Sequence, residues 1–187
     1  WALEEVGQPY DTVALEYYTT MKAPKYLAVN PMGKVPAIVH DGKVVTEVAA
    51  ICTYLALTFP EAGLMAVDKA AFFRWMFFAA GPLEQAVVNM GFGWKTSGPQ
   101  EKRRAGYGDL ADVLSALTGH LEKNDYIADG RFTAADVYVG SQIGWGMQFG
   151  GIPASDTLAA YWARLKDRPA LLAANAKDNA LIPEATT

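Results

Sequence analysis

Apolar residues follow two different periods along this chain. In one stretch they flank Asp41-Gly42, a pair typical of a two-residue hairpin turn, and so predict antiparallel strands over residues 35–40 and 43–46. From Glu47 onward the spacing is helical, and this helix is expected to end at Pro60. The change of period therefore predicts a strand hairpin followed directly by a helix.

Shorter elements are expected before the hairpin. Leu3 and Val6 share a helical face and Gly7 follows them, which is typical of the end of a helix. Residues 10–18 alternate between apolar and polar side chains and predict a strand, whereas residues 23–31 predict a short helix or turn.

Beyond a connector at residues 59–68 the pattern is helical only. The first helix is expected over residues 70–89, with a bend at Gly81-Pro82. Further helices are expected over residues 110–121, over 157–168 and from Pro169.

The segment around Thr133 carries the signature of a helix start. Thr133 can cap the helix, and Asp136 stands at its third position. Phe132 and Val137 have the spacing of a hydrophobic staple across the same turn. This signature predicts that a well-defined helix begins here.

The pattern as a whole predicts an α+β domain over residues 1–58, a linker over 59–68 and an all-helical domain over 69–187.

The net charge of −4 provides no basic patch, so nucleic acid and anionic membrane are not expected as partners. No apolar run reaches the roughly 18 residues that a membrane helix needs. One cysteine, Cys52, excludes an internal disulfide and fits a reducing compartment.

Pro36 stands at the start of a predicted strand, where it cannot donate a ladder hydrogen bond. A cis bond after Val35 would turn the Val35 main chain outward, free to pair with an extended peptide. Glu47 offers a carboxylate to a cation, and Val48 opens a helix whose free N–H groups favour an anion. These features predict a cleft for a small zwitterionic peptide. The simpler alternative is an edge-strand proline beside solvated charges at Lys34 and Glu47.

The segment "NPMGKVPAIV" followed by "TEVAAICTYL" resembles the glutathione-site signature of the cytosolic glutathione transferases. The segment "FTAADVYVG" is similar to the start of the core helix in their C-terminal domain, and "RWMFFAAGPLE" resembles the first helix of that domain in bacterial members. The resemblance covers Trp1 to about Ala174. It implies a thioredoxin-like N-terminal domain, an all-α C-terminal domain, a homodimer, a cytoplasmic location and detoxification of small hydrophobic electrophiles by conjugation with glutathione.

The resemblance also implies roles for individual residues. Val35, before a cis Pro36, would pair with the cysteinyl backbone of glutathione, the co-substrate. Glu47 would hold the γ-glutamyl amine and the N–H of Val48 the neighbouring carboxylate, with Lys34 near the glycyl carboxylate. Position 48 is Val where the family normally has Ser or Thr, and the lost hydrogen bond is expected to weaken glutathione binding by about ten- to a hundredfold.

No catalytic residue is assigned from this sequence. The family stabilises the glutathione thiolate with a Tyr, Ser or Cys after its first strand. Because the chain begins within a helix and without methionine, that residue and one further strand are expected upstream of Trp1.

The aromatic run over residues 72–78 places rings on every helical face, so most of them are expected in the core. The resemblance implies that one or two of them also form a wall of the electrophile pocket, and we assign Phe73 and Phe77 to it. Trp145 and Met147 are expected to approach the same pocket from a later helix.

The remaining reactive side chains are assigned structural roles. Cys52 lies on the apolar stripe of its helix and is expected to be buried and inert. His40 and His120 are too isolated for a metal site, and no metal is expected.

The leading interpretation is a glutathione transferase, and two alternatives stay open. A glutathione-dependent isomerase or peroxidase could use the same fold. A non-catalytic binding or interaction protein of the same family is favoured by the missing hydroxyl at Val48.

Overall fold

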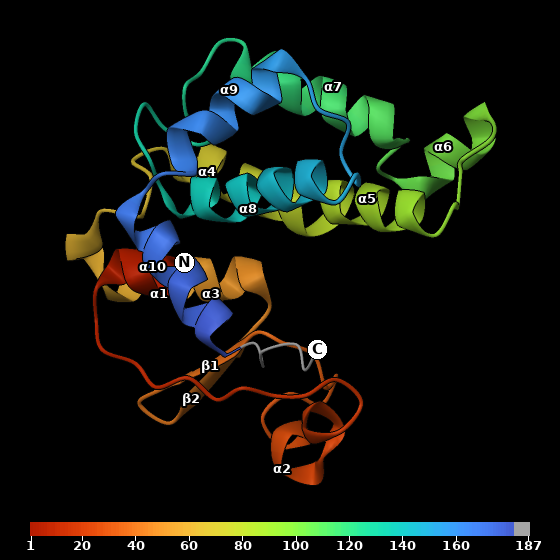
Figure 1. The fold of residues 1–187 in the computed structure, drawn as a ribbon. Helices are drawn as coiled ribbons and strands as arrows, with labels where there is room; N and C mark the ends of the chain where they lie inside the picture. Colours follow the sequence, from red (N-terminus) through yellow and green to blue (C-terminus); the bar gives the residue numbers. More distant parts are fainter. Residues whose placement is uncertain (182–187) are drawn as a thin grey trace, which may run out of the picture.

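The computed structural model describes residues 1–181, whose elements form two groups along the chain (Figure 1). The first group consists of α1 (Ala2–Val6), the 3₁₀ turn η1 (Thr20–Lys22), α2 (Pro24–Leu27), β1 (Ala37–His40), β2 (Lys43–Thr46) and α3 (Val48–Thr58). A second 3₁₀ turn, η2 (Pro60–Ala62), follows in the connector.

The second group is entirely helical. It consists of α4 (Lys69–Phe78), the π-helical turn η3 (Ala79–Leu83), α5 (Glu84–Gly91), α6 (Pro99–Ala105), α7 (Leu110–Leu121), α8 (Ala134–Gln148), α9 (Asp156–Leu165) and α10 (Pro169–Ala180). The fold is therefore a small α+β unit of the thioredoxin-like kind followed by an all-α unit, as the sequence predicts.

The predicted hairpin is confirmed. β1 and β2 pair antiparallel, from Ala37 opposite Thr46 to His40 opposite Lys43. Asp41 and Gly42 both have positive φ, at 49° and 72°, as the two-residue turn requires. The first strand begins two positions later than expected, at Ala37.

The predicted strand over residues 10–18 is wrong. The only sheet in the described part of the chain has two strands, β1 and β2, and residues 10–18 form no ladder with either of them. Alternation of side chains produces a strand only where a neighbouring strand completes its hydrogen bonds. Val13 and Tyr18 are 79% and 89% exposed, so the apolar side chains of this segment also lack a surface to pack on.

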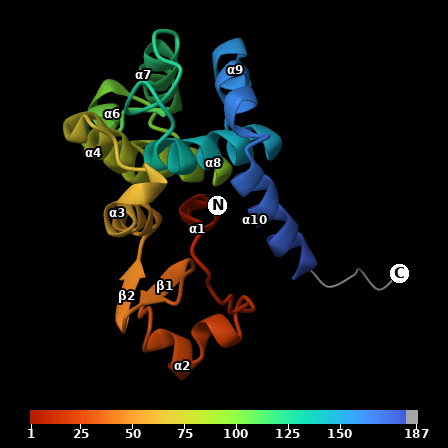
Figure 2. The same ribbon diagram turned by 90° about the vertical axis from the view of Figure 1, so that its left-hand side faces the viewer.

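The helices are arranged in layers (Figures 1 and 2). α4, α5 and α8 run side by side through the helical unit, with α7 and α9 on one side. α1, α3 and α10 lie on the other side, next to the hairpin. α8 thus contacts helices of both units and occupies the middle of the molecule.

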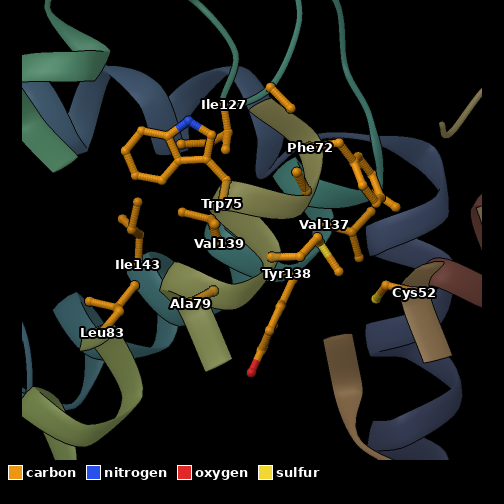
Figure 3. Packing of buried hydrophobic residues seen from close by; sticks show 14 of the residues in the cluster. Cys52, Phe72, Trp75, Ala79, Leu83, Ile127, Val137, Tyr138, Val139 and Ile143 are labelled. Carbon is orange, nitrogen blue, oxygen red and sulfur yellow. The ribbon is translucent and has the colours of Figure 1, made fainter. Parts of the chain in front are cut away.

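The core lies where α4 crosses α8. Figure 3 shows Phe72 and Trp75 of α4 packed against Val137, Val139 and Ile143 of α8. Phe72 and Trp75 are fully buried and Phe78 packs against the same cluster, so three of the five rings in the run belong to the core, as expected. Burial of such rings is the largest source of apolar stabilisation available to this unit.

A charged contact also joins α1 to the residue that precedes α10. Arg168 donates two hydrogen bonds to the Glu5 carboxylate of α1, at 2.7 and 2.8 Å. Its guanidinium lies 3.5 Å from the ring centroid of Phe132. This paired and stacked geometry, which suits arginine better than lysine, holds α1 against the start of α10.

The expected bend at Gly81-Pro82 takes the form of the π-helical turn η3. Pro82 has no N–H to donate, and the Glu84 N–H instead bonds to the Ala79 carbonyl, five residues back. Gln142 of α8 donates a second hydrogen bond to the Ala79 carbonyl, at 3.2 Å. The bend is therefore fixed by a side chain from the neighbouring helix.

The predicted start of α8 is confirmed and lies entirely inside the protein. The Asp136 carboxylate accepts hydrogen bonds from the N–H groups of Thr133 and Ile127, both at 2.8 Å. Tyr161 of α9 donates a third, at 2.9 Å. Burial raises the pKa of Asp136, and these hydrogen bonds oppose that rise. One carboxylate thus connects α8, α9 and the loop before α8.

We expect Asp136→Asn to lower the free energy of unfolding by about 3 kcal/mol, because an amide turns a buried N–H toward a main-chain donor. Urea denaturation followed by circular dichroism measures this loss. The matched control is Asp112→Asn in α7, which occupies the same position of a solvent-exposed capping box. There the loss should stay below about 1 kcal/mol. Equal losses in the two variants would contradict the importance of burial at Asp136.

Candidate functional site

The main chain at Val35 is free to bind a partner. The Val35–Pro36 peptide bond is cis, and β1 begins only at Ala37. Within residues 1–181, the N–H and C=O of Val35 form no hydrogen bond, and the residue is 48% exposed. A free N–H and C=O on one residue can pair with an extended peptide in the manner of an added strand.

Side chains near α2 hold this loop in place. The Lys34 carbonyl accepts hydrogen bonds from the Tyr26 hydroxyl at 2.6 Å and from the Asn30 amide at 2.8 Å. Lys22 Nζ donates to the Gly33 carbonyl at 2.7 Å. Sequence reasoning missed these three supports, because a side chain that bonds a distant carbonyl leaves no periodic pattern. The Lys34 side chain itself is exposed beside the loop.

Glu47 and Val48 lie next to this loop. Since Ala37 pairs with Thr46, the next positions outward, Pro36 and Glu47, leave the hairpin on adjacent strands. No side chain in the described part of the chain caps the N-terminus of α3, so its first N–H groups are available to an anion. The Val48 side chain packs against the core and contributes no polar atom. The structure thus brings Val35, Pro36, Glu47 and Val48 together.

Glu47 has an unusual backbone. Its φ of 67° and ψ of 122° lie in a region that residues with a Cβ rarely adopt. Its side chain is exposed and takes part in none of the ion pairs formed by residues 1–181. Strain of this kind is concentrated at functional sites, where the position of one side chain matters more than local stability.

A cavity of about 280 Å³ lies between α5 and α8. Its lining consists of Glu84, Val87, Val88, Gln142, Trp145, Gly146 and Phe149. The rings of Trp145 and Phe149 are 68% and 66% exposed, and their centroids are 5.0 Å apart. A concave, mostly apolar surface with few polar groups is typical of a site for a small hydrophobic molecule.

The structure brings only part of the predicted electrophile pocket to this cavity. Trp145 lines it, whereas Phe73, Phe77 and Met147 do not. Phe73 and Phe77 are 40% and 69% exposed on α4, and Met147 packs against the core. Phe149 was missed, although its spacing of one helical turn from Trp145 could have indicated it.

The remaining candidates have structural roles. Cys52 is 3% exposed, which confirms that it is buried, and burial raises the pKa of its thiol to about 12, as expected for a structural cysteine. His40 Nδ1 lies 2.8 Å from the Tyr54 hydroxyl, and His120 packs on Trp75 with ring centroids 4.6 Å apart. Burial lowers the pKa of His120.

Residues 1–181 contain no cluster of acidic, histidine and cysteine side chains suited to a metal ion. None of the helices described there is long and apolar enough to span a bilayer.

We expect Glu47→Gly to raise the free energy of unfolding by about 1 kcal/mol, because glycine adopts this φ without strain. Thermal and urea denaturation measure the gain. Asp41→Gly is the matched control: Asp41 also has positive φ, but in a turn where aspartate is well tolerated, and its change should stay within about 0.5 kcal/mol. A Glu47→Gly protein no more stable than the control would show that the Glu47 backbone is unstrained.

Comparison with known proteins identifies the family of the chain. The family profile described as "Glutathione S-transferase, N-terminal domain" matches residues 1–58, and "Glutathione S-transferase, C-terminal domain" matches residues 77–169. Glutathione S-transferase GstA of Escherichia coli O157:H7 is 26% identical over 175 residues, which cover 89% of this chain and 86% of that protein. Glutathione S-transferase GST-4.5 of Xanthomonas campestris pv. campestris is 32% identical over 151 residues, which cover 73% of each chain.

A solved structure extends the likeness to three dimensions. The sphingomonad glutathione S-transferase complexed with glutathione superimposes with a TM-score of 0.77 at 30% identity, covering 97% of this chain and 92% of that one. The chain therefore belongs to the glutathione S-transferase family.

Proposed function

We propose that the protein is a transferase that conjugates the thiolate of glutathione to small hydrophobic electrophiles. The observation that carries this proposal is the unpaired N–H and C=O of Val35, beside Glu47 and the uncapped N-terminus of α3. Glutathione is an extended peptide with an ammonium group and two carboxylates, so this arrangement suits it. Membership of the family, and a structural relative that binds glutathione, support the same assignment.

Each residue of the site receives one role in this proposal. The Val35 main chain, after the turn made by Pro36, pairs with the cysteinyl residue of glutathione. Glu47 binds the γ-glutamyl ammonium, and the N–H of Val48 binds the neighbouring carboxylate. Lys34 lies on the exposed side of the same loop, where it can approach the glycyl carboxylate.

Catalysis in this proposal consists of activating the thiol and bringing two reactants together. A free thiol has a pKa of about 8.5, and each unit by which it is lowered requires about 1.4 kcal/mol. We assign no described residue to that task. The cavity beside Trp145 would hold the electrophile within reach of the thiolate, so that the reaction benefits from proximity. Phe73, Phe77 and Met147 remain predicted contacts of larger electrophiles.

We extend the proposal to the organisation of the protein. The glutathione-binding domain would cover residues 1–58, the linker 59–68 and the helical domain 69–187, of which 182–187 lie outside the described residues. Glutathione is the co-substrate and no metal takes part. A homodimer in the cytoplasm is expected.

A second candidate function is a non-catalytic binding protein of the same family. The apolar Val48 favours it, because the side chain provides no hydroxyl for the γ-glutamyl carboxylate. A glutathione-dependent isomerase or peroxidase would share the glutathione site and differ only in its second substrate.

Two measurements test these functions. Calorimetry should detect glutathione binding, and a chloronitrobenzene should be converted to its glutathione conjugate, followed by absorbance. Binding without conjugation would contradict a transferase that accepts aryl halides and would favour the binding protein or the related enzymes. Absence of glutathione binding would overturn the whole proposal.

We expect Val48→Thr to tighten glutathione binding by about tenfold, because a hydroxyl adds one hydrogen bond to a charged carboxylate. Calorimetric titration of both proteins measures the change. Val44→Thr on β2 is the matched control, since that valine is 45% exposed and away from the helix start. An affinity that changes equally in the two variants would show that position 48 does not contact the carboxylate.

A further inference from the structure

Two neighbouring cavities meet at Glu84, the first residue of α5. The cavity of about 280 Å³ described above shares Glu84 and Val88 with a second one of about 500 Å³. The second cavity extends from the π-helical turn η3 to residues 105–107, after α6. Among the residues that line either cavity, all within the described chain, Glu84 is the only one with a charged side chain.

No cationic side chain of residues 1–181 pairs with this carboxylate. Its Oε2 accepts a hydrogen bond from the Tyr138 hydroxyl at 3.2 Å, and Glu84 takes part in none of the ion pairs formed within residues 1–181. The basic run Lys102–Arg104 on α6 contributes no side chain to either lining. Lys102 is already paired with Asp109.

The Tyr138 hydroxyl is influenced by negative charge, mainly that of Glu84. Burial is the largest cause that raises its pKa, and the negative charges of Glu84 and Glu47 add to the rise. Figure 3 shows the Tyr138 hydroxyl at the end of its ring that points away from the buried apolar cluster. Glu84 and Glu47 thus act electrostatically on the same hydroxyl group.

The other side chains of the smaller cavity leave Glu84 as its charged group. Glu84 is exposed, and Val87, Trp145 and Phe149 beside it are apolar and supply no cation that would compete for its carboxylate. The exposed ring of Trp145 also favours a positively charged ligand, because a cation is attracted to the face of an indole.

We propose that Glu84 makes this pocket selective for aromatic electrophiles that carry a positive charge, and that it disfavours anionic ones. The aromatic part would lie against Trp145 and Phe149, with the cationic group at Glu84. A longer molecule would continue past Glu84 into the larger cavity. This inference rests on the proposed function, since it names the class of second substrate for the same site.

Calorimetric binding of three matched probes, measured without glutathione, tests the inference independently of turnover. The probes are 1-naphthylmethyl-trimethylammonium (cationic), 1-naphthylmethanol (neutral) and 1-naphthylacetate (anionic). The unaltered protein should bind the cation about tenfold more tightly than the anion, as expected for one carboxylate at contact distance. Glu84→Gln, whose amide can still accept the Tyr138 hydrogen bond, should remove most of that preference and change the affinity for the neutral probe less than about twofold.

The control Glu122→Gln removes an exposed charge at the end of α7 and should leave the preference intact. Trp145→Ala should weaken the binding of all three probes. Tight binding of an anion, an unchanged preference in Glu84→Gln, or full affinity in Trp145→Ala would each overturn the inference. Raising the salt concentration should shrink the preference of the unaltered protein, which tests the charge effect without any variant.

Glutathione affinity, measured separately, distinguishes the two proposals. A protein that binds glutathione but shows no preference for the cation overturns only the role of Glu84. A protein that prefers the cation but does not bind glutathione overturns the proposed function and leaves the charge selectivity of the cavity in place.

Discussion

The buried carboxylate of Asp136 determines where α8 begins, and the rest of the molecule depends on that position. Three donors from different segments, Thr133, Ile127 and Tyr161, meet at this one side chain. A helix start held this way cannot shift by a residue without leaving a buried donor unpaired. Because side chains on a helix repeat every 3.6 residues, the fixed start also fixes the direction in which Trp145 points.

α8 then controls the shape of the neighbouring helix. Pro82 breaks the ordinary hydrogen bonding between α4 and α5, and Gln142 of α8 bonds the Ala79 carbonyl within the resulting π-helical turn. This turn sets the rotation of α5 and places Glu84 where Tyr138 of α8 can donate to it. The carboxylate at the junction of the two cavities is therefore a consequence of packing between two helices.

Features that depend on neighbours along the chain could be predicted from the sequence. The Asp41-Gly42 turn and the start of α8 at Thr133 follow from local dihedral preferences and capping chemistry, and the structure has both. Features that depend on distant partners could not. Residues 10–18 alternate correctly but have no ladder partner, and Glu84 acquires its place only through the bend before α5. The family signature led to Glu47, but nothing in the sequence indicated its strained backbone.

Each half of the proposed site carries one carboxylate, and bound glutathione would neutralise only one of the two. Glu47 would meet the ammonium of glutathione, which neutralises its charge once the peptide is bound. Glu84 has no such partner in either cavity lining, so its charge would persist in the complex. In the proposed complex the glutathione thiolate would add a further negative charge near the bound electrophile. An anionic electrophile would then be repelled by the nucleophile and by the pocket together, whereas a cationic one would be attracted by both. Selection by charge should therefore be sharper in the glutathione complex than in the free protein.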